Sequence, residues 1–385
     1  MIIVIYTLLT VLLGVLLLSF AIRLELGIRR FQIRRQYTPA VELPSVSVCV
    51  PARNETHAMT QCLERVLASD YPKMEIVVFD DESADDTSVL INSFAHAGVR
   101  FLPGTSLPEG WLGKNHALEV LAREASGTYV IFLDVDTHIQ PDTISQLVGY
   151  MTSEHLEMTS VIPGRYDAWR PNVLFGHLRY FWEIILSRES SPASASSLWM
   201  IKRATLLNII GGFVSHKAEV QPETRLAAII GTKAYHCLMD NENLGVSYEK
   251  KWQSQRETSR RLLYPMAGGT WYFAIIGLIT LIVLNVPFML VLSGLFVDWS
   301  RFQTLGLMYL ILFAAVYGRY TIAIWYRNWW VGIFVWPIVV LQELVLFIES
   351  LVGYAKGTIT WKGRSVLSPK MAKQIQSVQP ADLIR

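Results

Sequence analysis

The sequence of 385 residues has little cysteine and little charge. Its three cysteines, Cys49, Cys62 and Cys237, form no CxxC pair and no metal-ligand spacing. The spacing argues against a disulfide framework and a zinc site, and it favours a reducing compartment. Charged residues make up 17% of the chain, the net charge is +2, and no basic stripe with interleaved aromatic residues occurs. Nucleic acid is therefore not an expected partner.

Charge is absent altogether from the start of the chain. Residues 2–22 contain no charged side chain, and at ~1.5 Å per residue they can cross a hydrocarbon core of ~30 Å. A signal peptide is the alternative, but the run has no basic leader, is longer than the usual core of about 7–15 residues, and lacks a small-residue cleavage pattern. We therefore predict an N-terminal transmembrane helix over residues 1–23.

A basic linker over residues 24–44 follows this helix. The arginines at its start and within it are Arg23, Arg29, Arg30, Arg34 and Arg35. Basic residues beside a membrane helix favour the cytoplasmic side. The central domain is therefore predicted to be cytoplasmic, in a multi-pass protein of the cell membrane.

Further apolar runs predict C-terminal membrane helices within residues 266–355. The three runs are 271–297, 305–326 and 329–352. The third carries Gln342, Glu343 and Glu349, a polar load that is unusual for a helix facing lipid. If it crosses the membrane, the basic tail over residues 356–385 lies outside; if it is re-entrant or interfacial, the tail stays cytoplasmic. The positive-inside tendency favours the second alternative.

The middle of the chain alternates short β-rich runs with amphipathic helical stretches. The expected elements are strands at 46–50, 75–79 and 129–133 and a helix at 59–67. This order is typical of a mostly parallel sheet covered by helices, so residues 45–265 are predicted to form an α/β domain. Pro51 is expected to stop the first strand. Acidic residues follow the second and third strands, where open α/β sheets bind ligands.

The strongest motif is Asp134-Val135-Asp136, directly after the third strand. Alternate carboxylates at a strand end can turn toward one ion, and their hard oxygens suit Mg²⁺ or Mn²⁺ that also binds substrate phosphates. The alternative is a solvated turn. Asp80 and Asp81 after the second strand weaken that alternative, although helix capping would also explain an acidic loop there.

Four segments of this domain form an ordered series. They are Val48-Cys-Val-Pro-Ala-Arg-Asn-Glu55, Val77-Val-Phe-Asp-Asp-Glu-Ser-Ala-Asp-Asp-Thr87, Gly113-Lys-Asn-His-Ala-Leu118 and Phe132-Leu-Asp-Val-Asp136. The series resembles that of the family 2 inverting glycosyltransferases, which have a GT-A fold. Two further segments, Leu107-Pro-Glu-Gly-Trp-Leu-Gly-Lys-Asn-His-Ala117 and Thr360-Trp-Lys-Gly-Arg364, more narrowly resemble membrane enzymes associated with hopanoid and carotenoid glycosylation.

The resemblance implies that a nucleotide-sugar donor binds beside these motifs. The implied donor-binding residues are Pro51, Ala52, Arg53, Glu55, Asp80, Asp81, Lys114, Asp134 and Val135. Asp80 or Asp81 would hold the base. Asp134 and Asp136 would hold Mg²⁺ or Mn²⁺, which neutralises the leaving diphosphate. Lys114 is a second candidate for that role, although a loop lysine is often only solvated.

An inverting transfer also needs a base that takes the proton from the acceptor hydroxyl. The family usually supplies it from an acidic pair after a Gly-Gly turn. Here Gly211-Gly-Phe213 is followed by Glu219-Val-Gln-Pro-Glu-Thr-Arg225, so the pair falls on Glu223 and Thr224 and its second acid is missing. Glu223 is the candidate base and Glu219 its substitute. Both would otherwise be ordinary acids near a helix start.

These observations predict a metal-dependent membrane glycosyltransferase that moves a sugar from a nucleotide-sugar donor to a polyprenoid-type lipid with inversion. A lipid acceptor is favoured because a soluble acceptor gives no reason to place so much chain in a bilayer. One alternative is a short polysaccharide synthase, for which three or four membrane segments offer few helices to build a channel. The other is a catalytically inactive membrane scaffold, which the altered acidic pair keeps open.

Overall fold

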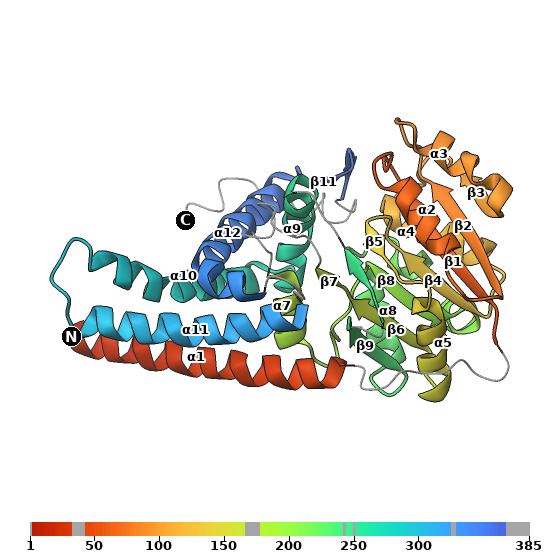
Figure 1. Cartoon of the computed structure of the whole chain (residues 1–385). Helices are drawn as coiled ribbons and strands as arrows, with labels where there is room; N and C mark the ends of the chain where they lie inside the picture. The colour runs from red at the N-terminus through yellow and green to blue at the C-terminus, as the bar shows by residue number, and fades with distance from the viewer. Residues whose placement is uncertain are drawn as a thin grey trace. The chain divides into compact units, whose positions relative to one another are not determined.

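The computed structural model describes residues 2–32, 43–165, 178–241, 244–248, 252–324 and 329–366. The chain forms two compact units, each assembled from three separate stretches. The helix unit comprises Met1–Arg30, Tyr166–Leu186 and Lys250–Ile359. The sheet unit comprises Phe31–Arg165, Ser187–Glu249 and Thr360–Arg385. Figure 1 labels their elements in chain order.

A seven-stranded sheet lies at the centre of the sheet unit. Its strands, in spatial order, are β3 (Val99–Pro103), β2 (Met74–Asp80), β1 (Val46–Ala52), β4 (Tyr129–Leu133), β8 (Leu198–Lys202), β6 (Met158–Ile162) and β9 (Tyr235–Met239). The first four run parallel, β8 is antiparallel to both of its neighbours, and β9 is parallel to β6. The predicted α/β domain with a mostly parallel sheet is confirmed.

Helices cover both faces of this sheet. They are α2 (Met59–Leu67), α3 (Thr87–Ser93), α4 (Gly113–Glu124), α5 (Thr143–Ser153) and α8 (Pro222–Ile230), with short turns η1 (Ala95–Ala97), η2 (Thr205–Ile210) and η3 (Val214–His216). On one face, Val46, Val48 and Val50 of β1 join a core with α2 and α5. On the other face, the Cys49 thiol contacts the Leu121 carbonyl of α4. This two-sided cover explains why β1 and β4 are almost continuously apolar.

Two small sheets complete the unit. One contains β5 (Thr137–His138), β10 (Ser247–Tyr248) and β7 (Gly164–Arg165). The other is a hairpin of β11 (Thr360–Trp361) and β12 (Arg364–Ser365), joined by a two-residue turn. We call residues 360–365 the C-terminal hairpin. It belongs to the sheet unit, although α12 (Trp329–Lys356) of the helix unit precedes it in the sequence.

The prediction that Pro51 stops the first strand is wrong, because β1 continues to Ala52. Beyond Cys49 only β2 continues beside β1, since the pairing of β1 with β4 ends there. The Ala52 carbonyl accepts a bond from the Asp81 amide on the β2 side. The nitrogen of Pro51 therefore faces the free edge, where its missing N–H breaks no sheet hydrogen bond.

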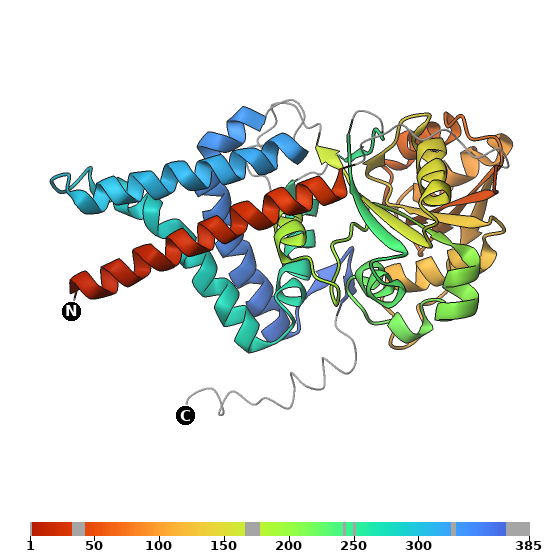
Figure 2. The same cartoon turned by 90° about the horizontal axis from the view of Figure 1, so that it is seen from below.

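The described part of the helix unit contains six helices. They are α1 (Ile2–Phe31), α7 (Arg179–Leu186), α9 (Trp252–Met266), α10 (Trp271–Ser293), α11 (Arg301–Ile324) and α12. Four of them, α1, α10, α11 and α12, are long and apolar enough to cross a membrane. Figure 2 shows these long helices from a second side. Apolar helices at both ends of the domain, as predicted, are confirmed.

The unit boundaries differ from the predicted domain limits in three places. Helix α1 continues to Phe31 rather than ending near residue 23, because Leu24 and Ile28 are buried and Phe20 packs edge-on against Phe181 of α7. Helix α9, expected within the domain over 45–265, belongs to the helix unit. The predicted tail over 356–385 begins with the last residue of α12 and the C-terminal hairpin; beyond Val366 it lies outside the described residues.

Candidate active site

The predicted site residues follow three strands that are neighbours in the sheet. The order β2, β1, β4 places the loops after Asp80, Ala52 and Leu133 side by side at one edge. Parallel strands end at the same edge, so their carboxyl ends can present side chains to one ligand. The residues predicted to bind the donor therefore lie on adjacent loops of the sheet unit.

The loops after β1 and β2 are joined by hydrogen bonds. The Asn54 amide donates to Ser83 Oγ at 2.8 Å, and the Ala84 amide donates to Asn54 Oδ1 at 2.9 Å. The Glu55 amide donates to Thr87 Oγ1 at 2.7 Å. These bonds satisfy backbone groups that have no partner in the sheet. The two loops therefore form one hydrogen-bonded rim.

Asp80 and Asp81 have different surroundings despite being neighbours. The carboxylate of Asp80 accepts bonds from the Ser83 amide, the Ser83 hydroxyl and the Ser88 hydroxyl, so both of its oxygens build the turn into α3. The carboxylate of Asp81 instead accepts two bonds of 2.6 Å from Arg364 of the C-terminal hairpin. Of the two acids predicted to bind the base, Asp80 therefore bonds within its own loop, whereas Asp81 bonds to a distant segment of the chain.

The Asp134-Val135-Asp136 motif lies directly after β4. The Asp134 amide donates to the Ser197 carbonyl at 2.9 Å, and Lys114 Nζ lies 2.5 Å from Asp134 Oδ1. Val135 is buried in the core, so its side chain does not line the site and only its backbone could meet a donor. Lys114, at the start of α4, therefore forms an ion pair with the first acid of the motif.

Glu55 belongs to the same acidic group. Burial raises the pKa of its carboxyl, and the charges of Asp136 and Asp134 raise it further, against the lowering effect of Lys362. Burial also raises the pKa of Asp81, and its bonds to Arg364 oppose that effect. Carboxylates crowded at one edge need cations or protons to be stable there. Lys114, Lys362 and Arg364 supply those cations.

Lys362 and Arg364 belong to the candidate site, although neither was among the residues predicted to form it. Lys362 Nζ donates to the Arg53 carbonyl at 2.8 Å and pairs with the Glu55 carboxylate. Arg53 Nε donates to the Lys362 carbonyl at 3.3 Å in return. Arg364 Nη2 also reaches Glu82 Oε2 at 2.6 Å. Their segment was visible only as part of a resemblance, because its contacts join residues about 300 positions apart.

The Asp134/Asp136 pair suits a divalent cation that is bound partly by the protein and partly by the phosphates of a substrate. In the described part of the chain, no group of three or more His, Cys, Asp or Glu side chains could hold an ion by itself. Mg²⁺ commonly takes one or two protein carboxylates and completes its shell with waters and substrate phosphates. Asp134 and Asp136 provide that donor set, with Lys114 as the present partner of Asp134.

The candidate bases lie in the segment that follows the Gly-Gly turn. Glu223 is buried in the first turn of α8, whereas Glu219 is exposed. The buried Asn115 of α4 donates to the carbonyls of His216, Lys217 and Glu219 at 2.9, 3.2 and 2.8 Å. Helix α4 thus binds the segment before α8 through Asn115, which is the neighbour of Lys114 in the sequence.

A second connection joins α8 to the acidic pair. Ser194 Oγ lies 2.6 Å from Thr224 Oγ1, and Ser197 of the same segment accepts the bond from the Asp134 amide. Residues 194–197 therefore contact both the start of α8 and the end of β4. Glu223, next to Thr224, is connected to the donor-side acids by short stretches of backbone.

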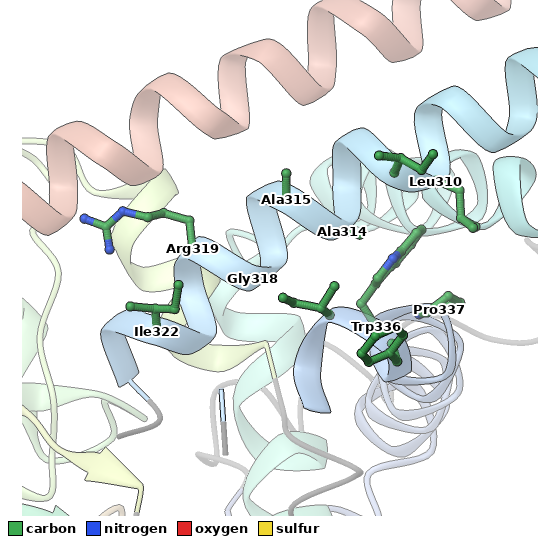
Figure 3. Close-up of a pocket in the computed structure, with 11 residues that line it drawn as sticks. Leu310, Ala314, Ala315, Gly318, Arg319, Ile322, Trp336 and Pro337 are labelled. Carbon is green, nitrogen blue, oxygen red and sulfur yellow. The ribbon is translucent and has the colours of Figure 1, made fainter. Parts of the chain in front are cut away.

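A separate groove of about 670 Å³ lies in the helix unit (Figure 3). It is lined by apolar side chains of α11 and α12, including Leu310, Ala314, Trp336 and Pro337, with Arg319 as its charged member. Arg319 is paired with Glu25 at 2.9 Å. The lining offers no carboxylate that could act as a base. This groove suits hydrocarbon rather than group transfer.

Comparison with known proteins agrees with the predicted family resemblance. Residues 47–197 match the family model described as Glycosyl transferase family 2. An N-acetylglucosaminyltransferase of Rhizobium leguminosarum bv. viciae is 34% identical over 121 residues, which are 30% of this chain and 28% of that protein. The Escherichia coli enzyme UDP-Glc:alpha-D-GlcNAc-diphosphoundecaprenol beta-1,3-glucosyltransferase WfgD is 24% identical over 174 residues, 45% of this chain and 66% of that protein. Each match spans less than two thirds of the relative.

The fold has a solved counterpart. Mannosyltransferase PcManGT from Pyrobaculum calidifontis, in complex with GDP-Man and Mn²⁺, superposes with a TM-score of 0.56 at 18% identity, over 90% of this chain and 97% of that chain. At this identity the likeness shows the fold. With the match over residues 47–197, it shows that the chain carries a Glycosyl transferase family 2 domain of GT-A-like fold.

Proposed function

We propose that the protein is a membrane glycosyltransferase that moves a sugar from a nucleotide-sugar donor to a lipid acceptor with inversion. The observation that carries the proposal is the acidic edge of the sheet: Asp81, Glu55 and the Asp134/Asp136 pair follow three adjacent strands of a family 2 domain. The apolar helices on both sides of that domain in the sequence support the membrane part.

In this proposal the donor lies across the ends of β2, β1 and β4. Asp81 accepts hydrogen bonds from the base, and the segment from Pro51 through Ala52 and Arg53 lines the nucleoside. Asp80 supports the turn through its bonds to Ser83 and Ser88. The hydrogen bonds of the rim hold these groups in place before the donor binds, which lowers the entropy cost of binding.

The diphosphate end of the donor lies near Asp134 and Asp136. A divalent cation held by these carboxylates would supply Lewis-acid stabilisation of the leaving diphosphate. Lys114 is held beside Asp134 at 2.5 Å. Its ammonium can follow the negative charge onto the phosphate oxygens as the bond to the sugar breaks.

Glu223 is the proposed base for the acceptor hydroxyl. It is buried in the first turn of α8, in the segment that follows the Gly-Gly turn, and a positioned carboxylate can take the proton of an attacking hydroxyl. Glu219 is exposed and remains the substitute. Inversion follows when the acceptor attacks the sugar from the face opposite the diphosphate, with its proton passing to this carboxylate.

A lipid acceptor is favoured by the membrane helices and by the named substrates of relatives. The Escherichia coli relative is described as acting on a diphosphoundecaprenol acceptor. The apolar groove between α11 and α12 would lie at bilayer depth if these helices enter the membrane, a place suited to a hydrocarbon chain (Figure 3). We propose a polyprenoid-type lipid as the acceptor class.

The sheet unit is proposed to be cytoplasmic, with α12 not crossing the membrane. The chain leaves the sheet unit at Glu249 and returns to it at Thr360, where the C-terminal hairpin pairs with Asp81 and Glu55. Departure and return on one side require an even number of crossings. Three candidate helices, α10, α11 and α12, lie between. At least one of the three helices must therefore enter or contact the membrane without crossing it.

Contacts within the helix unit favour α12 as the helix that does not cross the membrane. Arg256 of the charged helix α9 binds both oxygens of Glu349, and Ser350 Oγ donates to the Arg260 carbonyl. Glu343 is buried and accepts a bond from Trp182. The part of α12 free of charge, residues 329–342, spans only ~21 Å at ~1.5 Å per residue. A re-entrant or interfacial helix fits this length better than a full crossing.

The proposal is tested by following label from a panel of nucleotide sugars into lipid. The detergent-purified protein is incubated with UDP-, GDP-, dTDP- and ADP-sugars, divalent metal and membrane lipid extract. We expect label in the lipid phase, loss of transfer with chelator, and a decrease of about 100-fold or more in Asp136→Ala. Asp298→Ala, which changes an exposed acid between α10 and α11, is the matched control and should transfer normally.

The products separate the proposal from its rivals. One sugar per lipid, in the anomeric configuration opposite to that of the donor, supports the proposed transfer. A ladder of added sugars would support a short polysaccharide synthase. A protein that neither binds nor consumes any donor of the panel would be a scaffold, and the proposed function would be abandoned.

A further inference from the structure

We propose that the C-terminal hairpin is part of the donor site and that Lys362 and Arg364 bind the diphosphate of the nucleotide sugar. The inference rests on the proposed function for the class of donor. It assigns a role to two residues that come from the end of the described chain.

The hairpin lies along the path that the diphosphate must take. In the sheet, β1 separates β2 from β4, so a donor with its base at Asp81 and its metal at Asp134 and Asp136 must pass the end of β1. Arg364 is bound to Asp81, after β2. Lys362 is bound to Glu55 and to the Arg53 carbonyl, after β1. The two cations therefore occupy consecutive points between base and metal.

The charges at this edge make such cations necessary. Glu55, Asp81, Asp134 and Asp136 are all carboxyl groups, and phosphates brought among them would be repelled. Lys114 neutralises Asp134 at the metal end. The hairpin adds a cation beside the Glu55 carboxylate and one beside the Asp81 carboxylate, where Arg53 also donates to the Asp81 carbonyl. A guanidinium fork and an ammonium are the groups that proteins use for phosphate oxygens.

Lys362 lies in the turn of the hairpin, in a backbone conformation that lysine rarely adopts. Lys362 and Gly363 both have left-handed backbone conformations, with φ of 47° and 80°. Glycine or asparagine is preferred at such positions, and a lysine there is unfavourable. A residue kept in a costly conformation suggests a role for its side chain. Here the side chain reaches Glu55 inside the site.

Both cations can exchange one anion for another without leaving the site. The side chains of Lys362 and Arg364 are only 19% and 18% exposed, and both face carboxylates that lie next to the donor path. When the diphosphate arrives, its oxygens replace the carboxylate oxygens as acceptors. Asp81 is thereby released to accept hydrogen bonds from the base.

The test measures binding of UDP, GDP, dTDP, ADP and CDP, and of the matching nucleosides, to the full-length protein in nanodiscs by calorimetry. We expect Lys362→Met and Arg364→Gln each to weaken binding of the preferred nucleoside diphosphate by about 10-fold or more, because each removes a charged phosphate contact. Affinity for the nucleoside should change by less than about twofold. Lys362→Arg should keep most of the affinity, since it keeps the charge.

Arg100→Gln is the matched control. Arg100 is an exposed arginine of the sheet unit that is paired with Glu75 and Glu124, near the amino ends of β3 and β2 and away from the carboxyl ends that form the candidate site. It should bind nucleotides as the unchanged protein does. If a hairpin variant does not fold, the dependence of nucleotide affinity on salt concentration in the unchanged protein and in Lys362→Arg gives the second measurement; an affinity that does not fall with rising salt contradicts the proposal.

The outcomes separate failure of this inference from failure of the proposed function. If the unchanged protein binds a nucleoside diphosphate but the variants bind it equally well, the inference is wrong and the glycosyltransferase proposal stands. Equal loss of nucleoside and nucleotide affinity would show a structural role, and a gain in nucleotide affinity would show that the hairpin covers the site; each overturns the inference. If the unchanged protein binds none of the five nucleotides, both proposals fail.

Discussion

At the scale of single residues, Asp240 is the buried acid whose protonation the fold controls most clearly. It follows β9 in the sheet unit, and its Oδ1 accepts a bond of 2.6 Å from the Val246 amide. Its Oδ2 is buried with no hydrogen-bond partner and faces Gly164. Burial raises the pKa of Asp240 to about 7, although backbone donors oppose this. The carboxyl is thus neutral in the folded protein at mildly acidic pH.

The pKa of Asp240 predicts a dependence of stability on pH. An unfolded chain has an aspartate pKa near 3.9, so between about pH 4 and pH 7 the folded state binds more protons than the unfolded state. Stability from this group is therefore fully present below about pH 4 and is lost as pH rises toward 7, by up to roughly 4 kcal/mol. The midpoint of thermal unfolding at pH 5 and at pH 8 measures this loss.

Asp240→Asn removes the titration and keeps the shape of the side chain. We expect the variant to lose less stability than the unchanged protein between pH 5 and pH 8. Asp298→Asn, at an exposed position, should retain the full decrease. Equal decreases for the unchanged protein and Asp240→Asn would show that Asp240 is ionised throughout.

At the scale of elements, α4 connects the two halves of the site. Lys114 in its first turn pairs with Asp134, and Asn115 donates to the carbonyls of His216, Lys217 and Glu219. One turn later, Glu119 accepts a bond of 2.6 Å from the Phe213 amide beside the Gly-Gly turn. Residues on the proposed donor side and on the proposed acceptor side are therefore held by one helix.

Asn115→Ala should loosen the acceptor side more than the donor side. The substitution leaves the carbonyls of His216, Lys217 and Glu219 without their buried donor, at a cost of about 1–3 kcal/mol in unfolding free energy. Because Lys114 stays in place, kcat for transfer should fall more than the donor KM rises. Denaturant unfolding and steady-state kinetics measure the two effects.

Asn92→Ala is the control for this helix substitution. Asn92 is an exposed residue of α3 whose amide donates only to the Ser88 carbonyl. A surface change of this kind should stay within about 0.5 kcal/mol. If Asn115→Ala behaves like Asn92→Ala in both measurements, α4 does not position the acceptor side.

The sequence predicted correctly the limits of those helices and strands that are defined by their own residues. The helix Met59–Leu67 and the strand Tyr129–Leu133 have the predicted limits, because their apolar spacing and flanking residues are sufficient to define them. The Asp134/Asp136 motif was found for the same reason. The different surroundings of Asp80 and Asp81 were not predictable, because they depend on which carboxylate bends into the α3 turn and which meets a residue 283 positions away.

At the scale of the whole molecule, the proposed even number of membrane crossings between Glu249 and Thr360 can be tested directly. The native cysteines Cys49, Cys62 and Cys237 are all buried, so a membrane-impermeant thiol reagent reports on introduced cysteines. We expect Asn92→Cys in the sheet unit and Ser365→Cys in the hairpin to react on the same side of the membrane. Asp298→Cys, between α10 and α11, should react on the opposite side.

The side of each label identifies the topology. With intact cells, only Asp298→Cys should be modified from outside; with inside-out vesicles, only the other two should be modified. Reaction of Ser365→Cys together with Asp298→Cys would mean that α12 crosses. In that case the hairpin could not pair with Asp81 and Glu55, and the inferred role of Lys362 and Arg364 would fall with it.

The position of the hairpin also has a consequence for biosynthesis. Ribosomes make Arg53 and Asp81 long before Lys362 and Arg364, and all three C-terminal apolar helices are made in between. Glu55 and Asp81 thus wait for Lys362 and Arg364 until the membrane segments have been synthesised. A nascent or truncated chain lacking the hairpin would carry Glu55 and Asp81 unneutralised at the place where the diphosphate is proposed to bind. Donor use is therefore expected to begin only after the protein has reached its membrane.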